Sequence, residues 1–140
     1  MIARGGGRIV DIVSVTGTTA WPTVSATSAA KTALIRHAEN LAVAGRDHGL
    51  RVFALHPGMV RTQLLLSYRS DPGLREFLDT APAEAFTPPD VAADAVVRIV
   101  RGELDGCTGR FLDAIGDLAA QVEASAFAAE LLTLRLVHAP

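Results

Sequence analysis

The sequence predicts an α/β fold with a parallel sheet, because three short apolar runs alternate with helical stretches. The runs are Arg8–Val15, Arg51–His56 and Arg110–Asp113, and each is flanked by glycine or proline. Short β-branched runs between turn residues are typical of buried parallel strands. Right-handed crossovers should then place helices against the faces of the sheet.

Three segments between and after these strands have helical patterns. The first, Ser25–Asp47, contains no proline, and its alanine and leucine residues recur at helical spacing. A second helix is predicted over Val91–Val100, with the Thr87 hydroxyl as N-cap and proline in the first turn. The alanine-rich segment Gly116–Leu136 is predicted to be mostly helical, with an extended segment at Thr133–Val137 as an alternative for its end.

Composition narrows the class of protein. A chain of 140 residues that is 49% hydrophobic is sized for a single domain with its own core. The net charge is −2 and the arginines are scattered, which argues against a nucleic acid or an anionic membrane surface as partner. The uncharged stretch Ile12–Ala30 is too rich in polar residues, glycine and proline to span a bilayer, and the first residues lack the apolar run of a secretory signal. We therefore expect a cytoplasmic protein.

Cysteine and histidine usage predicts neither a disulfide nor a metal site. The single cysteine, Cys107, excludes an internal disulfide and a cysteine metal cluster. The histidines have no mutual spacing that suggests a metal; they are His37, His48, His56 and His138.

A set of polar residues follows the first predicted strand at regular intervals. Ser14 lies at the end of that strand, Thr27 comes thirteen residues later, and Lys31, the only lysine, comes four residues after Thr27. Residues four apart share one face of a helix, so Thr27 and Lys31 should lie side by side. The next strand ends in His56-Pro57-Gly58-Met59-Val60-Arg61-Thr62.

These motifs resemble the C-terminal half of the short-chain dehydrogenase/reductase family, which has a serine after a strand, Tyr-x-x-x-Lys thirteen residues on, and a Pro-Gly-x-Val-x-Thr segment. The resemblance covers nearly all of residues 1–140. It implies one partial domain with a Rossmann-like, doubly wound parallel sheet, of which about three strands are present and the N-terminal half is absent. The strand Arg8–Val15 would then be an exposed apolar edge.

The resemblance also implies a site and its ligands. In the family, the serine, here Ser14, hydrogen-bonds the substrate carbonyl, and the lysine, here Lys31, binds the nicotinamide ribose. Pro57, Gly58 and Thr62 correspond to residues that lie against the nicotinamide. The implied cofactor is NAD or NADP, and the implied substrate is a small carbonyl compound or alcohol.

The sequence departs from the family at two places. Thr27 occupies the position of the catalytic tyrosine, and its hydroxyl is too short and too weakly acidic to replace a phenol. The family's Gly-x-x-x-Gly-x-Gly phosphate loop is not found, because the glycines at 5–7 precede a strand and open no helix. The only tyrosine, Tyr68, is either a replacement acid brought in by the family's mobile substrate loop or a lid or surface aromatic, and the second interpretation is favoured.

Three functional hypotheses stay open at this point. The chain is a truncated oxidoreductase of this family, inactive by itself and with doubtful cofactor binding. Alternatively it is a non-catalytic binding or oligomerisation module that uses the helix Ser25–Asp47, or it is a decayed gene product. Thr27 favours the last two over an active enzyme.

Overall fold

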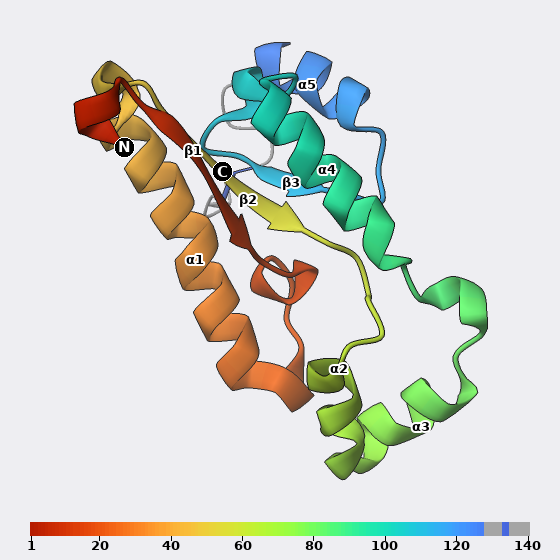
Figure 1. Ribbon diagram of the computed structural model, residues 1–140. Coiled ribbons are helices and arrows are strands. Elements are labelled where there is room, and N and C mark those ends of the chain that lie inside the picture. The colour runs from red at the N-terminus through yellow and green to blue at the C-terminus, as the bar shows by residue number, and fades with distance from the viewer. Residues whose placement is uncertain (128–132, 135–140) are drawn as a thin grey trace.

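The computed structural model, which describes residues 1–127, 133 and 134, contains a three-stranded parallel sheet (Figure 1). The strands are β1 (Gly7–Ile12), β2 (Leu50–His56) and β3 (Phe111–Asp113), arranged in the order β1-β2-β3. The full length of β1 pairs with β2, and the last part of β2 pairs with β3. The predicted α/β class and partial parallel sheet are confirmed.

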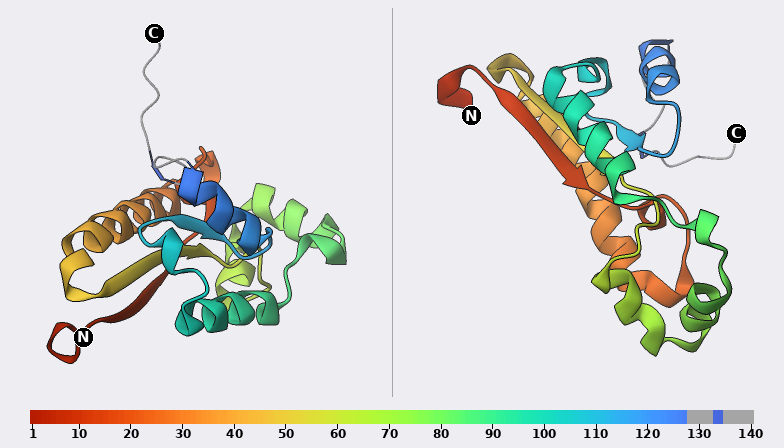
Figure 2. Two further views of the ribbon diagram at one scale, coloured as in Figure 1. Left: turned by 90° about the horizontal axis from the view of Figure 1, so that it is seen from above. Right: turned by 45° about the vertical axis from the view of Figure 1, so that its right-hand side comes forward.

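Helices cover both faces of the sheet and one of its ends. They are α1 (Ser25–Ala44), α2 (Gln63–Ser67), α3 (Pro72–Thr80), α4 (Pro89–Arg101) and α5 (Leu118–Phe127). Seen from above, α1 and α4 lie on opposite faces of the sheet (Figure 2). The short helices α2 and α3 lie beyond the carboxyl ends of the strands (Figure 1).

The central strand β2 supplies both halves of the core. Val52 and Ala54 pack toward α1, whereas Phe53 and Leu55 belong to the cluster that includes α4. All four side chains are buried, and burial of one large apolar side chain contributes about 1.5–3 kcal/mol. Alternate side chains of a strand point to opposite faces, so a strand that is apolar throughout needs a helix on each side.

The first strand forms an edge of the sheet. Among the described residues β1 pairs only with β2, and Ile12 at its end is 45% exposed. The predicted apolar edge is therefore present in the described structure.

The first strand is shorter than predicted, because it ends at Ile12 and not at Val15. The Ser14 hydroxyl accepts a hydrogen bond from the Thr16 amide (3.2 Å) and caps a 3₁₀ turn over Val15–Gly17. A Cβ at Gly17 would lie 2.8 Å from the backbone carbonyl carbon of Lys31. The turn can therefore pack closely against α1 only because residue 17 is glycine.

The long helix also ends earlier than predicted, at Ala44 and not at Asp47. A Cβ at Gly45 would lie 2.7 Å from the Leu50 Cβ, so the chain turns sharply there. A 3₁₀ turn over Arg46–His48 then leads into β2.

The predicted N-cap of α4 is wrong. The capping position belongs to Pro88, and no side chain caps this helix. The Thr87 amide instead donates to the Met59 carbonyl (2.9 Å), and the Thr87 side chain packs against Gly58. A tertiary contact has replaced the local cap that the sequence pattern indicated.

The remaining boundaries differ slightly from prediction. Strand β3 begins at Phe111, one residue later than expected. Helix α5 begins at Leu118 and not at Gly116, because the Asp117 carboxylate accepts hydrogen bonds from the amides of residues 119 and 120. Of the alternative extended segment Thr133–Val137, residues 135–137 lie outside the described structure, and residues 133 and 134 are not in a strand.

The described residues contain neither a membrane-spanning helix nor a metal-ligand cluster. Within residues 1–127 and 133–134, no helix combines the length and apolar character that crossing a bilayer requires. In the same part of the chain, no group of three or more His, Cys, Asp or Glu residues is arranged to hold a metal ion.

Candidate active site

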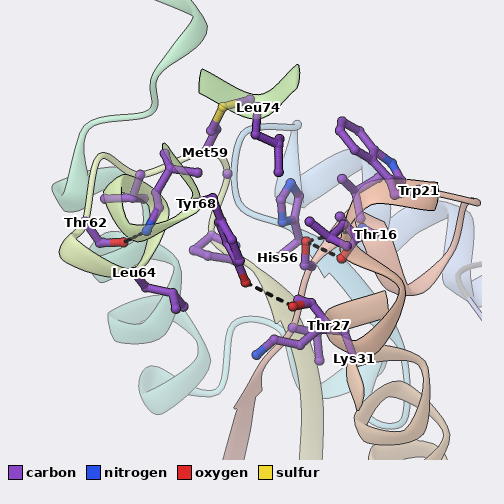
Figure 3. Close-up of a pocket in the computed structure, with 18 of the residues that line it drawn as sticks. Thr16, Trp21, Thr27, Lys31, His56, Met59, Thr62, Leu64, Tyr68 and Leu74 are labelled. Carbon is purple, nitrogen blue, oxygen red and sulfur yellow. Dashed lines mark hydrogen bonds between the residues drawn. The ribbon is translucent and has the colours of Figure 1, made fainter. Parts of the chain in front are cut away.

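A cavity of about 450 Å³ lies at the carboxyl ends of β1 and β2, between α1 and the helices α2 and α3 (Figure 3). All the site residues predicted from the sequence line it; they are Ser14, Thr27, Lys31, Pro57, Gly58 and Thr62. Ligands of open parallel sheets bind at the carboxyl ends of the strands. The cavity is therefore the candidate active site.

Ser14 is oriented by the turn that follows β1. Its Oγ accepts hydrogen bonds from the Thr16 amide (3.2 Å) and the Thr16 hydroxyl (3.1 Å). Because both contacts use the oxygen as acceptor, the Ser14 proton remains available for donation. Ser14 can therefore donate to a carbonyl oxygen in the cavity.

Thr27 and Lys31 lie one turn apart on α1, as the spacing predicted, and both line the cavity. The Lys31 ammonium donates to the carbonyl of Ile12 at the end of β1 (2.8 Å). An ammonium has three N–H donors, so this contact leaves two for a ligand. That donor set fits the two hydroxyls of a ribose.

The segment after β2 forms the base of the cavity with Pro57 and Gly58. Gly58 has a φ of 83°, and a Cβ there would lie 2.2 Å from the Thr87 hydroxyl oxygen, so glycine is required. Thr62 caps α2 by accepting from the Leu65 amide (3.3 Å), which leaves its own proton to donate. A flat apolar surface beside a hydroxyl donor fits a nicotinamide ring with its carboxamide.

The opposite wall is apolar and was not predicted residue by residue. Its side chains come from α2 and α3, whereas Trp21 and Val24 line the cavity from the segment before α1, where Figure 3 shows Trp21 beside Thr16. The side chains of the opposite wall are Leu64, Leu65, Leu74, Phe77 and Leu78. The sequence signal that could have found them is the clustering of leucine and phenylalanine between residues 64 and 78. This wall can hold an uncharged, apolar part of a ligand.

Tyr68 is half-buried and reaches across the cavity to α1 (Figure 3). Its hydroxyl oxygen lies 3.0 Å from the Thr27 Oγ1. The sequence favoured a lid or surface aromatic at this position and did not predict this hydrogen bond. The contact places a phenol beside Thr27, which the resemblance predicts to occupy the position of the catalytic tyrosine.

His56 is a titratable group at the edge of the cavity. Burial lowers the pKa of its imidazole, and the nearby Asp113 carboxylate partly opposes this shift. Its ring stacks on Phe111, with 6.2 Å between ring centroids, and its Nδ1 has no hydrogen-bond partner within the described structure. Burial thus disfavours the charged form of the His56 ring, which packs against Phe111.

Much of the chain is similar in sequence to known proteins. The family model described as enoyl-(acyl carrier protein) reductase matches residues 1–114. The chain is 31% identical over 117 residues to 4-formylbenzenesulfonate dehydrogenase of Comamonas testosteroni, covering 81% of this chain and 46% of that protein. It is 35% identical over 123 residues to 2,5-dichloro-2,5-cyclohexadiene-1,4-diol dehydrogenase of Sphingobium indicum, covering 86% and 49%. The chain thus spans about half the length of these relatives.

Solved structures show the same fold. A gluconate 5-dehydrogenase from Burkholderia cenocepacia, in complex with NADP and tartrate, superposes with a TM-score of 0.69 at 27% identity, covering 85% of this chain and 47% of that one. A putative NAD(P)-dependent gluconate 5-dehydrogenase from Beutenbergia cavernae, with bound NADP, gives 0.68 at 29% identity, covering 81% and 46%.

Proposed function

Because the chain belongs to the short-chain dehydrogenase/reductase family, we propose that it carries the substrate and nicotinamide part of an NAD(P)-dependent oxidoreductase site. The observation that supports this most directly is the convergence of Ser14, Lys31 and the Pro57–Gly58 segment on one cavity. The proposed substrates are small carbonyl compounds or the corresponding alcohols. The predicted cytoplasmic location belongs to this proposal as well.

Each polar group has a distinct role in the proposed site. Ser14 donates its hydroxyl proton to the substrate oxygen and fixes the orientation of the carbonyl. Lys31 binds the ribose hydroxyls with the N–H donors that Ile12 leaves available. Pro57, Gly58 and Thr62 hold the nicotinamide, which when bound supplies or accepts the hydride.

The residues described here would hold only the nicotinamide end of the cofactor. Gly5 and Gly6 precede β1, Gly7 begins it, and none of them opens a helix, so they do not form a pyrophosphate site. Most of the affinity for a dinucleotide is expected from its phosphates and adenosine. We therefore propose that the 140-residue chain by itself is inactive and binds neither NAD(H) nor NADP(H) at micromolar concentration, which calorimetry can measure.

The proposed role of Lys31 can be tested in the complete native protein with Lys31→Met. We expect the Kd for the preferred nicotinamide nucleotide to rise at least about tenfold, because the ribose loses its ammonium partner. Arg46→Met is the matched control, since it removes an exposed cation beyond the far end of α1. An unchanged Kd in Lys31→Met would contradict the proposed cofactor site.

A second function is suggested by the exposed face of α1, which we propose as a contact between copies of this chain. Four exposed alanines recur there at helical spacing; they are Ala26, Ala29, Ala30 and Ala33. Small side chains allow helices to approach closely. Sedimentation equilibrium of the protein tests this role directly, and a monomer at all concentrations would exclude it.

A further inference from the structure

We propose that Tyr68 supplies the acid–base phenol that position 27 lacks. This inference rests on the proposed oxidoreductase function and assigns the proton-transfer step to a residue from a different segment of the chain. It is carried by the 3.0 Å contact between the Tyr68 hydroxyl and the Thr27 hydroxyl.

The first argument is position. The Thr27 Oγ1 is bonded directly to the Cβ of residue 27, so the Tyr68 oxygen lies beside the point from which a tyrosine at 27 would extend. The same cavity is lined by Ser14 and Lys31 (Figure 3). A phenol therefore lies in the site although α1 does not carry it.

The second argument is the choice of residue at position 27. An aromatic ring on this Cβ would compete with the Tyr68 hydroxyl for the same space. Threonine leaves that space open and also provides a hydroxyl that hydrogen-bonds the phenol. Alanine would give the space without the hydrogen bond. Threonine thus suits a site in which the phenol enters from the opposite wall.

The third argument is that the segment carrying Tyr68 is held in place. Tyr68 begins a 3₁₀ turn that leads directly to Asp71, which caps α3 through its side chain. The turn is tied to α3 by the Arg69–Asp79 ion pair (2.5 Å) and by the Arg75 Nε, which donates to the Arg69 carbonyl (2.8 Å). Proton transfer needs a positioned donor, and these contacts, together with the hydrogen bond to Thr27, restrict where the Tyr68 hydroxyl lies.

The proposed step is the reduction of a carbonyl by a reduced nicotinamide nucleotide. The carbonyl carbon accepts a hydride, that is, one proton and two electrons, and the C=O π bond breaks as the C–H bond forms. The carbonyl oxygen takes the Tyr68 proton and becomes a hydroxyl, and water then reprotonates the Tyr68 phenolate. Oxidation of an alcohol follows the reverse course, with the phenolate as base.

Kinetics of the complete native protein test the step with Tyr68→Phe, which removes only the hydroxyl. We expect kcat/KM to fall by about 10²-fold or more, the usual effect of losing a general acid, while the Kd of the nucleotide stays within about threefold. Thr27→Val should lower kcat/KM by about tenfold, because it removes only the positioning hydrogen bond. Thr80→Val, which alters a hydroxyl on α3 away from the cavity, is the control for both.

A spectroscopic measurement tests the contact without relying on activity. Tyr68 is the only tyrosine of these 140 residues, so the 140-residue chain labelled with 3-fluorotyrosine gives a single ¹⁹F resonance. Thr27→Val should move this resonance, whereas Thr80→Val should not. A resonance unaffected by Thr27→Val would overturn the proposed positioning.

The double variant Thr27→Tyr with Tyr68→Phe separates this inference from the proposed function. Loss of activity in Tyr68→Phe and its recovery in the double variant to within about tenfold of wild type would support the inference. Wild-type activity in Tyr68→Phe would overturn it and leave the oxidoreductase function standing. If the wild type is inactive and the double variant is active, the role of Tyr68 is overturned but the oxidoreductase function stands. If the wild type and the double variant are both inactive, the oxidoreductase function is rejected as well.

Discussion

The two walls of the cavity are built in different ways. The polar wall comes from the ends of β1 and β2 and from α1. It depends on close contacts of Gly17 with the backbone of α1 and of Gly58 with the Thr87 side chain. The apolar wall comes largely from α2 and α3, in which Leu78 is the one fully buried residue among those described. Ser14 and Pro57 thus lie just after strands packed into the core, and Lys31 lies on the long helix α1, whereas the apolar groups that would contact the rest of the substrate lie on short helices with one buried residue.

This difference indicates how the contacts to the substrate can vary while the groups proposed to bind the cofactor stay in place. Side chains on a packed strand end or a long helix keep their positions because the core holds them. A short helix held by one buried leucine, an N-cap and an ion pair can change its contacts at little cost to the sheet. Tyr68 is the exception, since it belongs to the apolar wall and bonds to the polar one.

The largest effect on stability is expected from a substitution of Leu78, the buried residue of α3. Leu78→Ala should destabilise the protein by about 2–5 kcal/mol, because it removes the anchor of α3 and leaves a cavity in its place. Urea unfolding measures this free energy. Leu64→Ala is the matched control, since Leu64 lies on the same wall but is 65% exposed, and its effect should stay within about 0.5 kcal/mol. Equal effects of both substitutions would show that α3 has no such anchor.

The packing of the polar wall against α1 can be tested at Gly17. Gly17→Ala should cost about 1–3 kcal/mol, because its Cβ would lie 2.8 Å from the Lys31 carbonyl carbon and force the turn away from α1. Differential scanning calorimetry should show a lower Tm. Gly73→Ala is the control, because only a side-chain atom lies nearby, at 3.5 Å, and alanine suits the helix better. A Gly17→Ala protein as stable as wild type would show that this close contact is not required.

The smallest effect on the free energy of unfolding is expected from the titration of His56. Its folded-state pKa is lowered, chiefly by burial, so the unfolded chain binds the proton more readily than the folded protein. The free energy of unfolding should therefore fall as pH decreases from neutral through the ordinary histidine range, and it should level off below the folded-state pKa. His56→Gln should flatten this slope in urea titrations, whereas His48→Gln, which removes an exposed imidazole, should retain it. A slope unchanged by His56→Gln would contradict this assignment.

The polar wall was largely predictable from the sequence, and physical reasons explain why. Parallel strands end at one edge of a sheet, so Ser14 and Pro57 had to lie near each other once both strands were identified. Thr27 and Lys31 followed from the four-residue spacing on a helix. These predictions needed only local patterns and the class of fold.

The apolar wall and the contacts of Tyr68 could not be predicted in the same way. The Tyr68 hydrogen bond joins residues 41 apart in the chain, and no periodicity relates a short loop helix to α1. The N-cap assigned to Thr87 failed for a similar reason, because a contact with Met59 and Gly58 decided the position of that residue. Tertiary contacts override local preference where the chain is short of regular structure.

The chain's single tryptophan and single tyrosine both line the cavity. The intrinsic ultraviolet emission of these 140 residues therefore originates at the candidate site. Trp21 is partly exposed, so a ligand that fills the cavity should shield its indole from water and shift its emission to shorter wavelength. Trp21 fluorescence should therefore report ligand binding in the cavity, so substrates can be screened without an added label.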